Sequence, residues 1–568
     1  MFVMVEKTNR RNFISLLGVG AASAVIFGVG GYLLGSSGRE IIERTITQAA
    51  ATATVTQTRT QTVTAPTTVT TTVMQTVEAK PARLVIAWPF EIVTLNPYRF
   101  SRNIPVESPM AAIYDRFLSQ GRDLIQLPGV IESWEWGPEK TSLDLRVRQG
   151  IKFHDGTPLT AEDVAFSLQT MKTPPNAYAG VWGVISNIEV TGASVVKLTL
   201  SRYDPSIIAW LGFLDAFVVP KHVWERVGPD EFGKNPVGSG PYKVKSFKPG
   251  ILELERFEDY WRGVASIKEV VFKEVLDPRS RAVEVEAGTS DYTLEIDIND
   301  FDRLSKTQGL RAVSQLVTDV AILMIPTYHP ETGNINVRLA MHYAIDKESI
   351  VKNILKGHGR VVHTTEAPGY RAYLPDFSFP YDPNRASQLL AAAGYSKSNP
   401  VKITVATFKG NFPRDYEVMQ AVVAMWREVG IEAELEVITI AQHFEMRNTG
   451  KMKHAHFYVW SNATGDPVNS VGHSQWPNSP FSTWRGLKAA NLTDYSGLMD
   501  EATQMLNPVF LEKDEEKRIA AAKQAAKYVV EKGLVIPLYQ LAQLHVMKSD
   551  IKYDPWPQGW VLPYYMTR

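Results

Sequence analysis

The 568-residue sequence contains no cysteine. This absence excludes disulfide bonds, thiolate metal sites, cysteine nucleophiles and a lipid-modified N-terminal cysteine. An excess of one charge is also missing, because 60 Lys and Arg balance 60 Asp and Glu. No overall field therefore draws the chain to nucleic acid. Neither a G-x-S-x-G nor an H-E-x-x-H motif is present. We expect a non-enzymatic protein with no metal site and no cofactor.

The first 38 residues have the pattern of a membrane segment. After Lys7, Arg10 and Arg11 the chain carries no charge until Arg39. An uncharged run of this length can cross a bilayer as one helix, and its positive front predicts that the rest of the chain lies outside. Residues 1–38 are thus predicted to be a signal or transmembrane anchor. Cleavage as a signal peptide at the small residues 22–24 is the alternative, although these lie in the middle of the run.

Residues 39–82 form a threonine-rich segment. Residues 45–76 include 15 Thr among 32 residues. A segment with so little to bury cannot offset its ordering entropy, so we expect a disordered, extended stalk. The stalk would tether the folded part to the outer face of the cytoplasmic membrane.

From residue 83 onward, short strand patterns alternate with helical ones, which predicts an α/β protein. RLVIAW (83–88), SLDLRVRQGIKF (142–153) and GILELERF (250–257) have strand patterns. The helical patterns are AEDVAFSLQTM (161–171), VRLAMHYAI (337–345), KESIVKNILKG (347–357), RASQLLAAAG (385–394), YEVMQAVVAMWREVG (416–430) and EEKRIAAAKQAAKYVVEKG (515–533). Four of these end on glycines placed for left-handed C-caps, namely Gly357, Gly394, Gly430 and Gly533.

The stretch FHDGTPLTAEDVAF (153–166) raises the question of catalysis, because His154 precedes Asp155. Side chains of adjacent residues seldom face each other. The stretch instead reads as a turn followed by a helix start, with Thr160 as the N-cap and Asp163 in the capping-box position. We interpret it as scaffold.

The region around this turn resembles the family 5 extracellular solute-binding proteins, which are peptide, nickel and oligosaccharide receptors of ABC importers. The resemblance starts with YDRFLSQGRDLIQLPGVIESWEWGPEKTSLDLRVRQGIKFHDGTPLTAEDVAFSL (114–168). Further similar stretches follow in order, namely NPVGSGPYKV (235–244), FEDYWRG (257–263), NVRLAMHYAIDKESIVKNILKGHG (336–359), YDPNRASQLLAAAGY (381–395) and GLVIPLYQ (533–540). The resemblance covers the chain from about residue 84 to the C-terminus.

The resemblance implies a two-lobed periplasmic-binding-protein-like fold of type II. Lobe I would comprise residues 83–318 and 534–568, with an extra subdomain at 115–235. Lobe II would comprise residues 319–533. Strands near LVTDVAILMI (316–325) and LVIPLY (534–539) would form the hinge. The implied protein is a monomer that closes on its ligand and delivers it to an ABC permease of the cytoplasmic membrane.

The segment 456–486 is the predicted ligand-binding region. Trp460, Trp476 and Trp484 lie within 25 residues, close to the amide of Asn462. Aromatic faces beside polar groups suit a sugar ring, because the ring stacks and its hydroxyls form hydrogen bonds. Asn462 also begins an N-glycosylation pattern, and a glycosylated Asn462 could not line a closed pocket.

Peptide-binding relatives carry, by resemblance, an Asp three residues after the tryptophan matched by Trp460. Here that residue is Ala463, and Asp466 is the nearest substitute. We therefore expect a neutral oligosaccharide ligand, with an oligopeptide as the alternative. The remaining predicted ligand contacts are Asn96, Tyr178, Trp182 and Glu366.

Two other functions remain open. A hydrolase on the same two lobes could use Glu366 and Asp466 as a carboxylate pair. A ligand sensor could dock its closed form onto a signalling partner.

Overall fold

The computed structural model describes residues 83–99, 107–173, 176, 179–213, 215–479 and 481–568, and the backbone of three strands between residues 42 and 73. The chain divides into two units, Met1–Ala79 and Lys80–Arg568. Residues 1–38 lie outside the described part, so the anchor stays a prediction. Among the described helices, none has the length and apolar character needed to cross a membrane.

The N-terminal unit contains an antiparallel sheet with strand order β1-β2-β3. Its strands are β1 (Ile42–Ala49), β2 (Thr52–Arg59) and β3 (Thr71–Val73). We expected a disordered stalk here, and the structure has paired strands in these three segments. Threonine, valine and isoleucine are β-branched and favour extended backbone, so a threonine-rich sequence has high strand propensity even where it can bury little.

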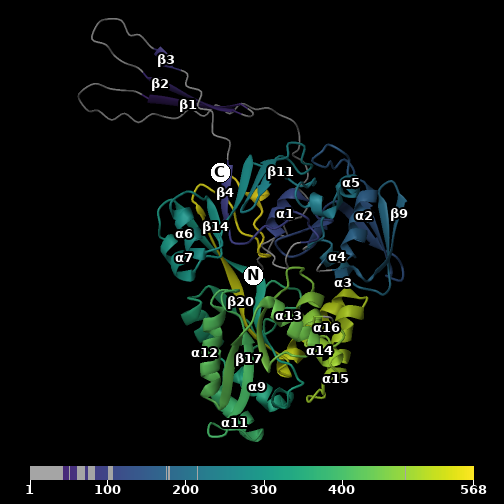
Figure 1. The fold of residues 1–568 in the computed structure, drawn as a ribbon, viewed down its shortest axis with the longest axis vertical. Helices are drawn as coiled ribbons and strands as arrows, with labels where there is room; N and C mark the ends of the chain where they lie inside the picture. The colour runs from purple at the N-terminus through teal and green to yellow at the C-terminus, as the bar shows by residue number, and fades with distance from the viewer. Residues whose placement is uncertain are drawn as a thin grey trace, which may run out of the picture. The chain divides into compact units, whose positions relative to one another are not determined.

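The second unit is organised around an 11-stranded sheet (Figure 1). Its path is β11-β12-β13-β4-β14-β20-β15-β19-β17-β18, and β16 pairs with β20 beside this path. In chain order these strands are β4 (Arg83–Trp88), β11 (Tyr242–Lys248), β12 (Ile251–Arg256), β13 (Glu269–Glu274), β14 (Tyr292–Leu294), β15 (Leu310–Met324), β16 (Gly359–Val361), β17 (Val401–Thr407), β18 (Ile431–Val437), β19 (Ala455–Ser461) and β20 (Val535–Lys548).

Strands β15 and β20 connect the two halves of this sheet. They pair antiparallel along almost their whole length, from Leu310 opposite Lys548 to Met324 opposite Val535. At one end β20 pairs with β14 of predicted lobe I, and at the other end β15 pairs with β19 of predicted lobe II. Figure 1 shows β20, in yellow, running from one half into the other. The two strands are therefore placed as the predicted hinge requires.

Helices cover the sheet and build three buried cores. One core includes Trp88 and Trp182 of lobe I, and another surrounds Trp484 of lobe II. The core around Trp426 spans the hinge, because it also contains Phe301 and Leu304 of α7 (Ile298–Leu304). Lobe I also holds a separate sheet with order β7-β8-β10-β9 and a two-stranded sheet β5-β6. These strands are β5 (Leu118–Gln120), β6 (Gln126–Pro128), β7 (Ile131–Trp136), β8 (Ser142–Val147), β9 (Ile185–Gly192) and β10 (Val195–Leu200).

The helices of lobe I are α1 (Ser108–Ile113), α2 (Ala161–Met171), α3 (Ala179–Trp182), α4 (Ser206–Trp210), α5 (Lys221–Phe232), α6 (Pro278–Glu286), α7 (Ile298–Leu304) and the short η4 (Pro563–Tyr565). Those of lobe II are α8 (Pro330–Gly333), α9 (Ile335–Tyr343), α10 (Lys347–Ser349), η2 (Ile350–Ile354), α11 (Pro383–Ala392), α12 (Asp415–Arg427), α13 (Ile440–Thr449), η3 (Val468–His473), α14 (Trp484–Ala489), α15 (Met499–Leu511) and α16 (Glu515–Glu531).

The prediction of an α/β protein is confirmed, and several elements match closely. The strand at 83–88 and the helix at 161–171 have the predicted bounds. The four predicted C-cap glycines all have positive φ, between 64° and 105°. The predicted helix 347–357 differs, because after one turn of α10 its backbone widens into the π-helical segment η2.

The turn at His154 is scaffold, as predicted. The ring of His154 accepts a hydrogen bond from the Gly238 amide at 3.2 Å, and its other nitrogen lies 3.0 Å from the Gly240 carbonyl oxygen. Thr160 and Asp163 form the capping box at the start of α2. The carboxylate of Asp163 accepts from the Thr160 amide at 2.9 Å, and the Thr160 hydroxyl accepts from the Asp163 amide.

Replacing Thr160 with alanine should lower the free energy of unfolding by about 1 kcal/mol, because one amide of the first turn loses its acceptor. Urea denaturation measures this change. Gln169→Ala, at an exposed position of the same helix, is the control and should change the value by less than about 0.5 kcal/mol. Equal effects of the two substitutions would contradict a role for the capping box.

Candidate ligand-binding site

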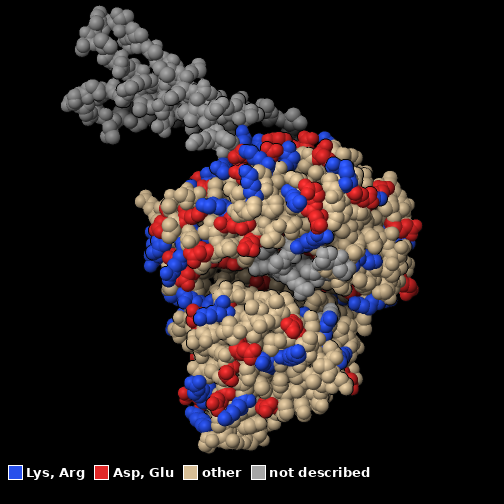
Figure 2. All heavy atoms as spheres, viewed as in Figure 1, with Lys and Arg blue, Asp and Glu red and all other residues tan. Residues whose placement is uncertain are grey.

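The loop that follows β19 joins the two lobes. The side chain of Gln120 in lobe I donates to the Ala463 carbonyl at 2.7 Å, and Gln126 donates to the Thr464 carbonyl at 2.9 Å. The Asn462 amide donates to the Thr318 carbonyl of the hinge at 3.0 Å. Figure 2 shows a hollow between the upper and lower halves of this unit, with acidic side chains in red at its edge. The lobes therefore touch through specific polar contacts beside an open recess.

The hinge strand β15 bulges where it passes between the lobes. Leu316 lies opposite Ala542 and Val320 lies opposite Gln540, so three residues of β15 face a single residue of β20. A bulge bends its strand and redirects side chains, and bulges are frequent beside binding sites. The third bulged residue is Asp319, which lies opposite Ser461 of β19.

The carboxyl group of Asp319 has an oxygen atom whose hydrogen-bonding capacity is not met by the described residues around it. Its Oδ1 atom is buried and has no hydrogen-bond partner among the described residues. Burial raises the pKa of Asp319 to about 6. The residue as a whole is partly buried, and a hydrogen bond from Ser461 offsets part of this rise in its pKa.

A second buried acid, Glu366, lies close by. Its carboxylate accepts from the Ser470 hydroxyl, and from Asn462 Nδ2 at 3.3 Å. Burial, together with the charge of Asp466, raises the pKa of Glu366 to about 7. Burial also raises the pKa of Tyr370, and the neighbouring Asp319 and Glu366 add to this effect. Tyr370 therefore lies near both acids.

We call Asp319, Glu366, Tyr370, Asn462 and Ser470 the hinge acid cluster. Within the described part of the chain, neither of its two acids lies within ion-pair distance of a Lys, Arg or His. The side-chain amide of Asn462 is also incompletely paired, since its Oδ1 has no hydrogen-bond partner and the residue is only 1% exposed. Two of the five members, Glu366 and Asn462, were predicted from the sequence.

The three predicted tryptophans belong to the interior of lobe II. Trp460 and Trp476 are partly buried and Trp484 is 2% exposed. The indole N–H of Trp460 donates to the Asn469 carbonyl at 2.7 Å, and Trp476 stacks on Phe510 with ring centroids 4.1 Å apart. All three pack in or against one hydrophobic core. The structure therefore does not bring them together as a stacking surface for a sugar.

Asp466 is held by an arginine. The Arg518 guanidinium donates to both carboxylate oxygens, at 2.9 and 2.7 Å. Both side chains are buried, with exposures of 1% for Arg518 and 7% for Asp466. Asp466 thus shapes the loop, and its charge is already compensated.

The remaining predicted contacts lie within lobe I or outside the described part. Asn96 is 1% exposed and bridges a turn, donating to the Pro229 carbonyl and accepting from the Tyr98 amide. Trp182 is fully buried and donates to Asp215 at 3.1 Å. Both residues have structural roles in this arrangement. Tyr178 lies outside the described residues.

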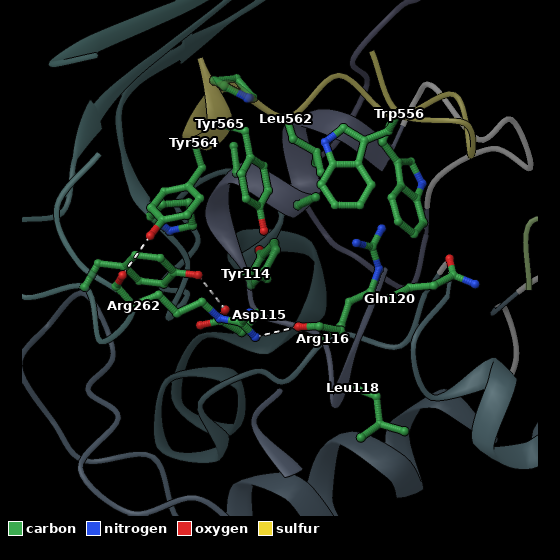
Figure 3. Close-up of a pocket in the computed structure, with 17 residues that line it drawn as sticks. Tyr114, Asp115, Arg116, Leu118, Gln120, Arg262, Trp556, Leu562, Tyr564 and Tyr565 are labelled. Atoms are coloured by element: carbon green, nitrogen blue, oxygen red, sulfur yellow. Dashed lines mark hydrogen bonds between the residues drawn. The ribbon is translucent and has the colours of Figure 1, made fainter. Parts of the chain in front are cut away.

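A cavity of about 80 Å³ lies within lobe I, lined by the chain around Arg116 and by the C-terminal segment (Figure 3). Arg116 lies between the rings of Phe217 and Trp560 and pairs with Glu107 at 2.9 Å. Asp115 accepts hydrogen bonds from the hydroxyl of Tyr260 and the indole of Trp261, both at 3.0 Å. Burial raises the pKa of Asp115, and the charge of Arg262 offsets part of that rise. These charges are compensated internally, so the cavity is a weaker ligand-site candidate than the hinge acid cluster.

Two lobes that meet across paired hinge strands, with uncompensated polar groups at the crossing, define a bilobal solute-binding protein. Residues 126–478 match the Bacterial extracellular solute-binding proteins, family 5 Middle. The chain belongs to this family, which confirms the resemblance seen in the sequence.

Curated and structural relatives agree with this assignment. Heme-binding protein A of Haemophilus influenzae is 25% identical over 441 residues, covering 72% of this chain and 78% of the relative. NikA from Brucella suis, solved in complex with Fe(III)-EDTA, superposes with a TM-score of 0.75 at 21% identity and covers 85% of this chain and 99% of its own. DppA from Helicobacter pylori, solved with the peptide STSA, gives a TM-score of 0.70 at 21% identity, with coverage of 85% and 97%. The two structures establish the fold, a two-lobed periplasmic-binding-protein architecture.

Proposed function

We propose that the protein is a receptor that captures a solute between its lobes outside the cell and delivers it to an ABC permease of the cytoplasmic membrane. The arrangement that carries the proposal is the crossing of β15 and β20 between the lobes, with the hinge acid cluster at the crossing. A ligand that contacts both lobes stabilises the closed form, and a permease that recognises only this form receives loaded protein. A membrane tether through residues 1–38 and a monomeric state belong to the same proposal.

We propose an oligopeptide as the ligand in preference to a neutral oligosaccharide. The tryptophans that favoured a sugar are engaged within lobe II, whereas the hinge region holds two acids, Asp319 and Glu366, without an ion-pair partner among the described residues. Relatives of this family include a dipeptide-binding protein of Escherichia coli and the oligopeptide-binding protein AppA of Bacillus subtilis. A peptide offers both a cationic group for these acids and a backbone for strand and loop contacts.

A hydrolase is disfavoured by the state of its candidate residues. Asp466 is occupied by Arg518 and therefore cannot share a reacting centre with Glu366 as a free carboxylate. A sensor remains compatible with the same closure, and it would differ from a receptor only in the protein that recognises the closed form.

Native mass spectrometry of the purified protein tests the receptor function. We expect a non-covalent solute that is released intact on denaturation. Removing the solute should increase the radius of gyration in small-angle scattering, and adding the released fraction back should reverse that increase. Recovery of a chemically altered solute would indicate an enzyme. An apo protein that shows no change on addition of the host's small-molecule extract would contradict capture between lobes.

A further inference from the structure

We propose that the extra subdomain of lobe I carries a clasp, a set of direct contacts with lobe II that favours the closed arrangement before any solute is bound. The clasp joins the tip of the β5–β6 hairpin, residues 120–126, to the lobe II loop 462–466. The inference rests on the proposed capture of a solute between the lobes. It adds a contribution to closure that the protein itself supplies.

Each lobe places one apolar side chain in the core of the other. Leu124 at the hairpin tip is 7% exposed and belongs to the core around Trp484 of lobe II. In return, Ala463 of the lobe II loop is fully buried in the core of lobe I. Separating the lobes here would expose both side chains to water, so their burial favours closure.

The backbones of the two segments approach too closely for a side chain at Gly465. A Cβ atom at this position would lie 2.4 Å from the Leu124 carbonyl oxygen, and Gly465 has a φ of 74°. Leu124 itself has a φ of 65°, a left-handed conformation that is uncommon for residues other than glycine. Such a conformation persists only where the surroundings fix it, and it is frequent at functional contacts. The tip is therefore shaped to fit the loop.

Two glutamines of the hairpin supply the polar part of the clasp. Besides their bonds to the carbonyls of Ala463 and Thr464, the side-chain nitrogens of Gln120 and Gln126 lie 3.3 and 3.4 Å from the Leu124 carbonyl oxygen. They thus hold the tip and the loop together. Gln120 is only 6% exposed, so opening at this point would leave a buried donor and a carbonyl without each other.

Further contacts between the subdomain and lobe II lie outside the hinge strands. The ring of Trp210 in α4 lies 6.4 Å from that of His473 in η3. Lys140, in the turn between β7 and β8, donates to the carbonyl of Lys513, between α15 and α16, at 2.5 Å. Figure 1 shows α4 on the side of lobe I that faces α16. The exposed lysine contact contributes little, but it extends the clasp along the subdomain.

A fixed pivot is the alternative to a clasp. The loop 462–466 begins beside the hinge, because the Asn462 amide donates to the Thr318 carbonyl. A pivot would keep Leu124 buried in both the open and the closed arrangement, and weakening it would not change their ratio. A clasp is broken on opening, so weakening it shifts the ratio toward the open arrangement.

Distances between two spin labels in the solute-free full chain test the clasp. Because the sequence has no cysteine, Glu189→Cys on β9 and Gln524→Cys on α16 place one label on each lobe, both at exposed positions. We expect two distances without solute, a shorter closed one and a longer open one. Leu124→Asn retains a residue that tolerates left-handed backbone but places a polar group in the lobe II core. It should lower the closed-to-open ratio about tenfold.

Two further variants control this measurement. Gln126→Ala removes the donor to the Thr464 carbonyl and should lower the ratio about threefold. Ile125→Asn makes the matched substitution at the next residue of the tip, which is 54% exposed, and should leave the ratio unchanged. Circular dichroism and the melting temperature show whether each variant is folded. If Leu124→Asn does not fold, Gln126→Ala decides alone.

Three outcomes would overturn the clasp. These are the absence of the closed distance in the solute-free chain, an unchanged ratio in folded Leu124→Asn, and an equal shift in Ile125→Asn. The measurement contains no solute, whereas the receptor function is judged by the solute that the native protein retains. Failure of the clasp can therefore be told apart from failure of the proposed function.

Discussion

Replacing Arg518 with methionine should lower the free energy of unfolding by about 3–5 kcal/mol, which is the usual cost of removing one partner from a buried ion pair. The substitution leaves the Asp466 carboxylate buried with the Val468 amide as its remaining close donor. The charge of Asp204 also acts on this group, as does that of Glu366 when it is ionised, and both repel the carboxylate. Guanidinium denaturation at neutral pH measures the loss.

A double-mutant cycle separates the ion pair from simple packing. Asp466→Asn together with Arg518→Met removes the unpaired charge, so the double variant should recover stability relative to Arg518→Met alone. Lys527→Met on the same helix α16 is the matched control, because its pair with Glu531 at 3.6 Å is exposed. Such a pair contributes well under 1 kcal/mol. Similar losses in the two single Met variants would show that the Asp466 contact is not the source.

Most of the fold could be predicted from the sequence because local signals, such as helix caps, agree with the tertiary structure. The capping box at Thr160 and the glycine C-caps mark helix ends whatever the tertiary context, and the structure has them as predicted. The threonine-rich segment shows the limit of composition. Its low apolar content predicted disorder, whereas β-branching gave three strands in the structure.

The site was harder to predict because burial decides the role of each residue. Three tryptophans close together in a loop-rich segment suggested a ligand-binding surface. The segment instead forms the short helices η3 and α14, and its tryptophans pack in or against a core of lobe II. Asp319 was missed, although one signal for it exists. It is the single charge within the apolar run LVTDVAILM of a hinge strand. The bulge that places Asp319 at the crossing depends on pairing with β19 and β20, which a sequence pattern does not specify.

Glu366→Gln should stabilise the ligand-free protein at pH 8 and have little effect at pH 5. Burial raises the pKa of Glu366 from 4.5 to about 7, so the folded state binds this proton more tightly than the unfolded state. Stability from Glu366 is therefore fully present below about pH 4.5 and is lost as the pH rises to about 7. The difference corresponds to an upper limit of about 3 kcal/mol above pH 7. Melting curves of the two proteins between pH 5 and pH 8 measure it.

The neutral variant keeps the size of the side chain and can keep its hydrogen bonds. The glutamine oxygen can accept from Ser470, and rotation of the Asn462 amide would turn its unpaired oxygen toward the new amide group. The exposed Glu434→Gln is the control and should change the melting temperature equally at both pH values. A loss of stability at pH 8 would show that Glu366 is already neutralised within the protein. A gain in stability at pH 8 without one at pH 5 would identify the ionised Glu366 as a destabilising charge of the ligand-free protein.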